Sequence, residues 1–198
     1  MLITADQVLF GDADALVAGW VETAAGRIVA TGTGVPPRPA DEQVDGVLIP
    51  GYVDVHSHGG GGASFVTEDP EVARQALAAH RRLGVTTMVA SLVTGSTPDL
   101  KRQVGCLADL VESGELAGIH LEGPWLALKY KGAHPPALLA DPDPGAVAEL
   151  LDAGRGTVKM VTVAPERAGA MDSIRLMVSR GVVAAIGHTD ADYDTTRA

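Results

Sequence analysis

From residue 47 onward, short apolar runs alternate with segments whose apolar residues recur three and four positions apart. The apolar runs predict buried strands, at residues 47–58, 85–93, 116–121, 158–163 and 182–186. The segments between them have the spacing of amphipathic helices, at residues 70–83, 97–113, 144–153 and 171–180. Alternation of this kind predicts a parallel sheet with right-handed crossovers.

The number of strands limits the fold class. A complete (β/α)₈ barrel needs eight strand–helix units and about 250 residues, whereas this α/β pattern supplies about five units. We therefore expect an incomplete TIM-type (β/α) barrel. A doubly wound open sheet is the alternative, but no Gly-x-Gly-x-x-Gly turn or phosphate loop follows a strand.

Residues 1–46 have a different pattern. Short β-type runs are separated by turn residues, and these runs lie at residues 7–10, 16–22 and 27–31. The segment contains no histidine, so we expect no chemistry there. The predicted organisation is a small, β-sandwich-like domain at 1–46 and the truncated barrel at 47–198.

Two histidines stand at the exit of the first predicted barrel strand. They end the run Pro50-Gly51-Tyr52-Val53-Asp54-Val55-His56-Ser57-His58-Gly59. Residues two apart in a strand point to the same face, so both imidazoles should project together, with Asp54 one step behind. Two neutral imidazoles on one rigid strand suit a divalent, zinc-like ion. Asp54 is expected to orient an imidazole from behind, with a buried salt bridge as the alternative.

Two further candidate ligands follow later strands. Glu122 ends the third predicted strand and His188 follows the fifth, so both should lie at the same edge of the sheet as His56 and His58. The four residues could hold one zinc, or two divalent ions bridged by Glu122. The structural alternatives are that Glu122 caps a turn and that His188 is a core histidine.

Two other reactive side chains fit structural roles. His80 falls at the core edge of the helix predicted at 70–83, and Cys106 falls within the apolar pattern of the next helix. We expect His80 to be structural and Cys106 to be a buried, inert thiol. A single cysteine also excludes an intrachain disulfide.

Charge and composition restrict the partners. The formal net charge of −10 argues against nucleic acid and anionic membranes, although local cationic and N–H groups can still bind a phosphorylated small substrate. With 46% hydrophobic and 20% charged residues, the chain has the composition of a globular protein. No apolar run approaches the roughly 20 residues of a membrane span, and no signal peptide is evident. We expect a cytoplasmic protein.

The run from Pro50 to Gly59 resembles the first-strand signature of the amidohydrolase superfamily. Three more segments make the chain similar to the N-acetylglucosamine-6-phosphate deacetylase family: His120-Leu121-Glu122-Gly123-Pro124-Trp125, Lys131-Gly132-Ala133-His134 and Ile186-Gly187-His188-Thr189. The resemblance covers essentially all 198 residues. It implies a metal-dependent hydrolase barrel with a small β domain. It also implies hydrolysis of N-acetylglucosamine 6-phosphate to acetate and glucosamine 6-phosphate, in amino-sugar catabolism.

The resemblance also implies the metal ligands. Glu122 and His188 match ligands of the family, and His56 and His58 match a second metal position that some members lack. The expected cofactor is therefore a divalent metal, with Zn²⁺ the leading candidate and one or two ions bound.

The substrate contacts implied by the resemblance lie in one loop. His134 matches the residue that contacts the substrate and its developing oxyanion, and the backbone of Gly132 and Ala133 would help hold the sugar. Two family groups have no counterpart in this sequence, namely a metal-binding histidine from the sixth strand and the catalytic aspartate. We therefore expect the isolated chain to lack its proton shuttle.

Two alternative functions remain at this stage. One is another amidohydrolase that acts on a cyclic amide or an isopeptide, which would not require a 6-phosphate. The other is a non-catalytic metal-binding fragment that works beside a second chain. Open sheet edges and uncovered apolar helix faces would favour assembly, so we expect a homo-oligomer.

Overall fold

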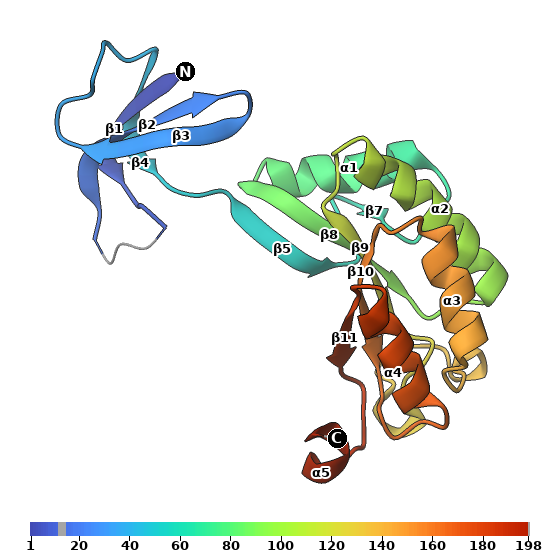
Figure 1. Ribbon diagram of the computed structural model, residues 1–198. Helices are drawn as coiled ribbons and strands as arrows, with labels where there is room; N and C mark the ends of the chain where they lie inside the picture. The colour runs from blue at the N-terminus through green and yellow to red at the C-terminus, as the bar shows by residue number, and fades with distance from the viewer. Residues whose placement is uncertain (12–14, 198) are drawn as a thin grey trace. The chain divides into compact units, whose positions relative to one another are not determined.

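A computed structural model describes residues 1–11 and 15–197 (Figure 1). The chain divides into two compact units, Met1–Gly51 and Tyr52–Ala198. Each unit has its own sheet.

The N-terminal unit is built on one four-stranded sheet with the order β3-β2-β1-β4. Its strands are β1 (Leu2–Val8), β2 (Val17–Ala24), β3 (Arg27–Thr33) and β4 (Glu42–Leu48). The strands β1, β2 and β3 pair antiparallel, whereas β4 pairs with β1 in parallel. The described residues thus form one sheet rather than the two packed sheets of a sandwich.

Two strands of this unit differ from the sequence prediction. The first strand begins at Leu2 and not at residue 7, because Asp6 and Gln7 interrupt an alternation that starts earlier. The fourth strand was missed, since its charged residues and Gly46 hide the apolar positions of an edge strand. Part of the loop before β2 lies outside the described residues.

The second unit contains five parallel strands in the order β11-β10-β9-β8-β5. These strands are β5 (Tyr52–Ser57), β8 (Val85–Val93), β9 (Gly118–Glu122), β10 (Val158–Val163) and β11 (Val183–Ile186). A two-stranded hairpin, β6 (Gly59–Gly60) and β7 (Ala63–Ser64), directly follows β5. The parallel sheet confirms the prediction of an incomplete barrel.

Helices connect these strands and cover one face of the sheet (Figure 1). They are α1 (Pro70–Arg81), α2 (Thr97–Glu112), α3 (Pro144–Ala153), α4 (Ala170–Ser179) and the short α5 (Tyr193–Arg197). Two 3₁₀ turns, η1 (Leu128–Tyr130) and η2 (Pro136–Leu138), lie in the loop after β9. None of the helices that the structure describes is long and apolar enough to cross a membrane.

The first three helices begin with the same local device. A side-chain oxygen accepts a backbone N–H of the first turn, and a proline occupies an early position that needs no N–H. The capping residues are Asp69, Ser96 and Asp143. Each of these helices therefore starts where its cap and proline place it.

The two faces of the parallel sheet have opposite character. The side chains that face the helices are apolar and fully buried, among them Leu92, Ile119, Leu121, Val161 and Val163. The opposite face carries a polar set, because residues two apart share a face. This set comprises Ser91, His120, Glu122 and Thr162. The sheet thus presents a row of polar side chains on the face that the helices leave free.

Two predictions about the apolar pattern are wrong. Val47 and Leu48 belong to β4, where they pair with Gln7 and Val8, so the first strand of the barrel begins at Tyr52 and the units divide after Gly51. The apolar run continues across the junction, so periodicity could not separate the two strands. The helix predicted at 70–83 ends at Arg81. Leu83 therefore lies beyond α1 and is 76% exposed.

Candidate metal centre

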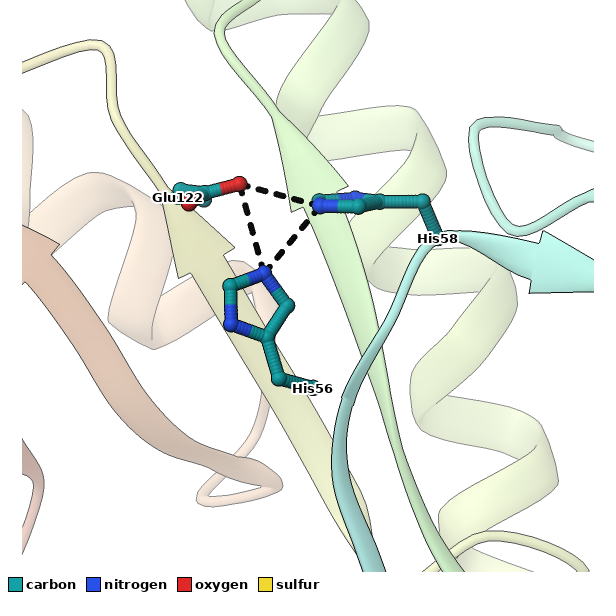
Figure 2. A group of neighbouring side chains, drawn as sticks. All are labelled: His56, His58 and Glu122. Carbon is teal, nitrogen blue, oxygen red and sulfur yellow. Dashed lines mark hydrogen bonds and ion pairs between the residues drawn. The ribbon is translucent and has the colours of Figure 1, made fainter.

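His56 and His58 point to the same side at the end of β5, and Glu122 reaches them from the end of β9 (Figure 2). The Nε2 atoms of the two histidines are 3.2 Å apart. The Oε2 atom of Glu122 lies 3.4 Å from His56 Nε2 and 3.0 Å from His58 Nε2. The spacing of the histidines therefore brings them together, as the strand geometry predicts.

A second group of histidines lies on the other side of the same carboxylate. His188, just after β11, places Nε2 3.0 Å from Glu122 Oε1. His134, in the loop after β9, places Nε2 3.7 Å from Glu122 Oε2. The rings of His134 and His188 pack edge to face, with centroids 4.9 Å apart. Glu122 is thus shared by two groups, one with His56 and His58 and the other with His134 and His188.

Hydrogen bonds fix which nitrogen of two rings faces the carboxylate. His58 Nδ1 lies 3.1 Å from the carbonyl oxygen of Ser91, and His188 Nδ1 lies 2.8 Å from that of Tyr130. A carbonyl only accepts, so each Nδ1 carries a proton, and in the neutral ring each Nε2 then presents a lone pair. This is the usual arrangement of a metal-binding histidine, whose second nitrogen donates to a backbone carbonyl.

His134 has the opposite tautomer. Its Nδ1 accepts the backbone N–H of Thr94 at 3.3 Å and lies 2.8 Å from the hydroxyl of the same residue. An accepting Nδ1 leaves the proton of the neutral ring on Nε2. Burial lowers the pKa of His134, with a further lowering by His188, which favours that neutral form. His134 is therefore arranged to donate a hydrogen bond toward Glu122 rather than to bind a metal through Nε2.

The donor set suits a divalent cation. Burial raises the pKa of Glu122, but His56, His58 and His188 together outweigh it and hold the pKa below its ordinary value. The carboxylate is then ionised at neutral pH, and the Nε2 atoms of three imidazoles, those of His56, His58 and His188, lie within 3.4 Å of it. Crowded lone pairs are unfavourable without a cation between them, and N and O donors of this kind bind zinc and similar ions.

The remaining predicted site residues lie close to these groups. Asp54 Oδ1 accepts the backbone N–H of His56 at 3.0 Å, so it contacts the backbone and not an imidazole. Gly132 lies beside the ring of His188, because a Cβ atom there would be 3.5 Å from His188 Cε1. Ala133 is exposed next to the buried His134.

The two residues predicted to be structural lie away from the carboxylate. His80 Nε2 is 3.0 Å from the carbonyl of Gly59 and 3.2 Å from the hydroxyl of Ser57, which ties α1 to the turn after β5. Cys106 is only partly buried, and burial raises its pKa.

Sequence reasoning missed three residues that support the site. Thr94 binds His134 from the end of β8. Glu166, after β10, accepts the hydroxyl of Thr189 at 2.5 Å and the N–H of Asp190 at 2.7 Å, and so holds the loop that follows His188. Both follow strand ends, and that position alone would have identified them.

The third missed residue is His120, which is fully buried on β9. Its Nδ1 lies 2.9 Å from the Ser91 hydroxyl and its Nε2 2.8 Å from the Thr162 hydroxyl. Burial lowers its pKa to about 4. His120 stands two residues before Glu122, so alternation along the strand would have placed it on the same face.

Comparison with known proteins agrees with this architecture. Residues 47–197 match the Amidohydrolase family, and the chain belongs to that family.

Its relatives include deacetylases of amino-sugar phosphates. The chain is 32% identical to the N-acetylgalactosamine-6-phosphate deacetylase of Escherichia coli O157:H7, over 77% of this chain and 41% of the relative. It is 34% identical to the human N-acetylglucosamine-6-phosphate deacetylase, over 78% of this chain and 41% of the relative.

Solved structures give the same result. The crystal structure of N-acetyl-D-glucosamine-6-phosphate deacetylase from Mycobacterium smegmatis matches with 53% identity and a TM-score of 0.95. The match covers 100% of this chain and 52% of that chain. A variant of that enzyme in complex with N-acetyl-D-glucosamine-6-phosphate matches with a TM-score of 0.94. The chain thus spans about half the length of the relatives it matches.

Proposed function

We propose that this chain carries the metal-binding half of a deacetylase that hydrolyses N-acetylglucosamine 6-phosphate to acetate and glucosamine 6-phosphate. The observation that carries the proposal is the sharing of Glu122 between two histidine groups, with the N–H of His134 directed at the same point. The names of the relatives support the substrate class. The proposal includes a role in amino-sugar catabolism in the cytoplasm.

The proposed metal is zinc, with one or two ions. His56, His58 and Glu122 would hold one position, and Glu122 and His188 would contribute to the other. A bound zinc would supply Lewis-acid polarisation of the acetamide carbonyl and would lower the pKa of a coordinated water.

The residues of this chain would then act on the substrate in defined ways. His134 would donate its Nε2–H to the acetamide oxygen and stabilise the negative charge that develops there. The neighbouring backbone at Gly132 and Ala133 would hold the sugar. His58 and His188, anchored by carbonyl acceptors, would keep their ring orientations during the reaction. The proton shuttle is expected from outside residues 1–198, so full turnover requires that missing group.

Acetate release from N-acetylglucosamine 6-phosphate in the presence of Zn²⁺ tests the proposal. With the missing half of a full-length relative added to supply the proton shuttle, we expect zinc-dependent release that Glu122→Gln abolishes. Glu115→Gln is the matched control, because Glu115 is a paired carboxylate at the start of a different loop. The same assay with N-acetylgalactosamine 6-phosphate tests the specificity suggested by one group of relatives.

Three outcomes would contradict this assignment in different ways. Release from substrates that lack the 6-phosphate at equal rates would favour an amidohydrolase of cyclic amides or isopeptides. Zinc binding without any release, even after addition of the missing half of a full-length relative, would favour a non-catalytic metal-binding role. A lack of zinc binding would overturn the metal centre itself.

A further inference from the structure

A layer of buried polar side chains lies directly beneath Glu122. Ser91 and His120 are fully buried and Thr162 is 7% exposed. The ring of His120 joins the two hydroxyls, at 2.9 Å from Ser91 Oγ and 2.8 Å from Thr162 Oγ1. Interior layers of (β/α) barrels are filled mainly by branched apolar residues, and buried polar groups are costly unless they are hydrogen-bonded to one another, as these are. Such a layer therefore calls for a specific role.

His56 is the one imidazole around Glu122 whose ring lacks an anchor. His58 and His188 each donate Nδ1–H to a backbone carbonyl, and His134 receives a backbone N–H. Within residues 1–11 and 15–197, the only hydrogen-bond contact of the His56 ring is through Nε2, toward His58. Its side chain is also the most exposed of the group, at 46%. The contacts of this ring with His58 and Glu122 are both made through Nε2, so they leave the tilt of the ring to packing.

The ring of His120 fills that role by packing. It meets the ring of His56 edge to face, with centroids 4.8 Å apart and planes at 78°. Edge-to-face pairs at this separation are favourable beyond the area that they bury. His120 cannot rotate freely, because hydroxyls from β8 and β10 hold both of its nitrogens.

Ser91 connects the same layer to His58. Its carbonyl oxygen accepts the Nδ1–H of His58, and its hydroxyl binds His120. A change at His120 therefore acts on His56 through ring packing and on His58 through one intervening residue. Both histidines of one cluster depend on the same buried ring.

We propose that His120 is a positioning residue that orients the His56 ring and so determines metal binding at the position formed by His56, His58 and Glu122. This inference rests on the metal role proposed above. His120 itself binds no metal, because both of its nitrogens are engaged by hydroxyls.

Zinc titration of the metal-free protein against a chromophoric chelator tests this role. The titration is done in a His188→Ala background, in which His56, His58 and Glu122 are the remaining ligand group. His120→Gln keeps hydrogen-bonding atoms but removes the ring, and we expect zinc affinity to fall about ten-fold, the range seen when an outer partner of a ligand is lost. With Co²⁺ in place of zinc, the visible absorption spectrum should change shape, which reports altered ligand geometry.

A control on the same strand separates positioning from general loss of stability. Ile119→Ala creates a cavity on the opposite, helix-facing side of β9, and it should lower the melting temperature without changing zinc affinity or the cobalt spectrum. If His120→Gln does not fold, Thr162→Val removes one anchor of the ring and should give a smaller loss of affinity with the same spectral change.

A failure of the positioning role and a failure of the proposed metal centre would give different results. Wild-type affinity and an unchanged cobalt spectrum in His120→Gln would overturn the positioning role, as would an equal loss of affinity in Ile119→Ala. Absence of zinc binding by the unmutated chain would instead overturn the metal centre.

Discussion

The two sides of Glu122 are assembled in different ways. His56 lies in β5 and His58 directly follows that strand, so local chain geometry alone directs both rings to one point. His134 and His188 come from two loops that are separated by 54 positions in the chain, and only the folded sheet brings them together. The first side is therefore encoded in a short motif, whereas the second depends on many contacts between distant segments.

The second side also needs more support. His188 has a positive φ of 51°, a conformation that a residue other than glycine adopts only when its surroundings enforce it. Its carbonyl accepts the N–H of Ala127 at 2.8 Å, and Glu166 holds the residues that follow it. Substitutions of residues far from Glu122 should therefore affect the position of His188 more than that of His56 and His58.

Loss of the shared carboxylate should have the largest effect. Glu122→Gln removes the negative charge that both sides use, so zinc affinity should fall by more than the roughly 10–100-fold that loss of an outer partner costs. Titration against a chelator would measure this. Retention of one tightly bound zinc would show that one side binds without the carboxylate, and the two sides would then be independent.

Removal of one histidine at a time should abolish metal binding at one position and leave the other position intact. His58→Ala should abolish zinc binding at the first position and leave the second, and His188→Ala should do the reverse. The number of zinc ions bound per chain, measured by atomic absorption, should fall by one in each variant if both positions fill. Identical losses of all metal in both variants would contradict the division.

A distant change should affect the His188 side alone. Glu166→Ala releases the Thr189 hydroxyl and the Asp190 N–H, so we expect a loss of about ten-fold in affinity at the second position. A His58→Ala background isolates that position, and a His188→Ala background reports the first, which should be unchanged. Equal losses in both backgrounds would mean that Glu166 supports the whole unit.

Glu115 is a carboxylate outside the site, and we expect its substitution to have the smallest effect of all, a change in stability that depends on pH. Hydrogen bonds from Arg74 lower the pKa of Glu115 from 4.5 to about 2. The folded protein therefore takes up this proton less readily than the unfolded chain, so the pair stabilises the fold above pH 4.5. That contribution is lost as the pH falls from 4.5 to about 2.

Urea unfolding of the wild type and of Glu115→Gln across this range would test the prediction. The two proteins should differ little in free energy of unfolding near neutral pH, because the pair of Arg74 and Glu115 is partly exposed. This difference should stay constant at neutral pH and vanish at low pH. A difference that grows on acidification would contradict the assignment.

Much of the fold could be predicted from periodicity. The strands Val85–Val93 and Val158–Val163 and the helix Pro144–Ala153 agree with the apolar pattern to the residue, because buried strands and one-sided helices leave a regular signal. The junction near Gly51 could not be predicted this way. The edge strands β4 and β5, which belong to two different sheets, share one apolar run there, and only the pairing of β4 with β1 distinguishes them.

The residues of the candidate site could be predicted where they stand at the carboxyl ends of strands. His56, His58, Glu122 and His188 were all found by that rule. The ring orientations were not, because the tautomer of His134 depends on Thr94, which lies 40 positions away. The contact of Asp54 with a backbone N–H shows the same limit, since a sequence pattern gives the face of a side chain but not its partner.

The sheet order β5-β8-β9-β10-β11 follows the order of these strands along the chain. A polypeptide leaving the ribosome would therefore add each strand beside the one made before it. The ligands His56, His58 and Glu122 are all present once β9 has been made, whereas His188 follows Glu122 by 66 residues. At about 5–20 residues per second, a cation has several seconds to find the first position before the second exists, so metal capture and translation can overlap in time.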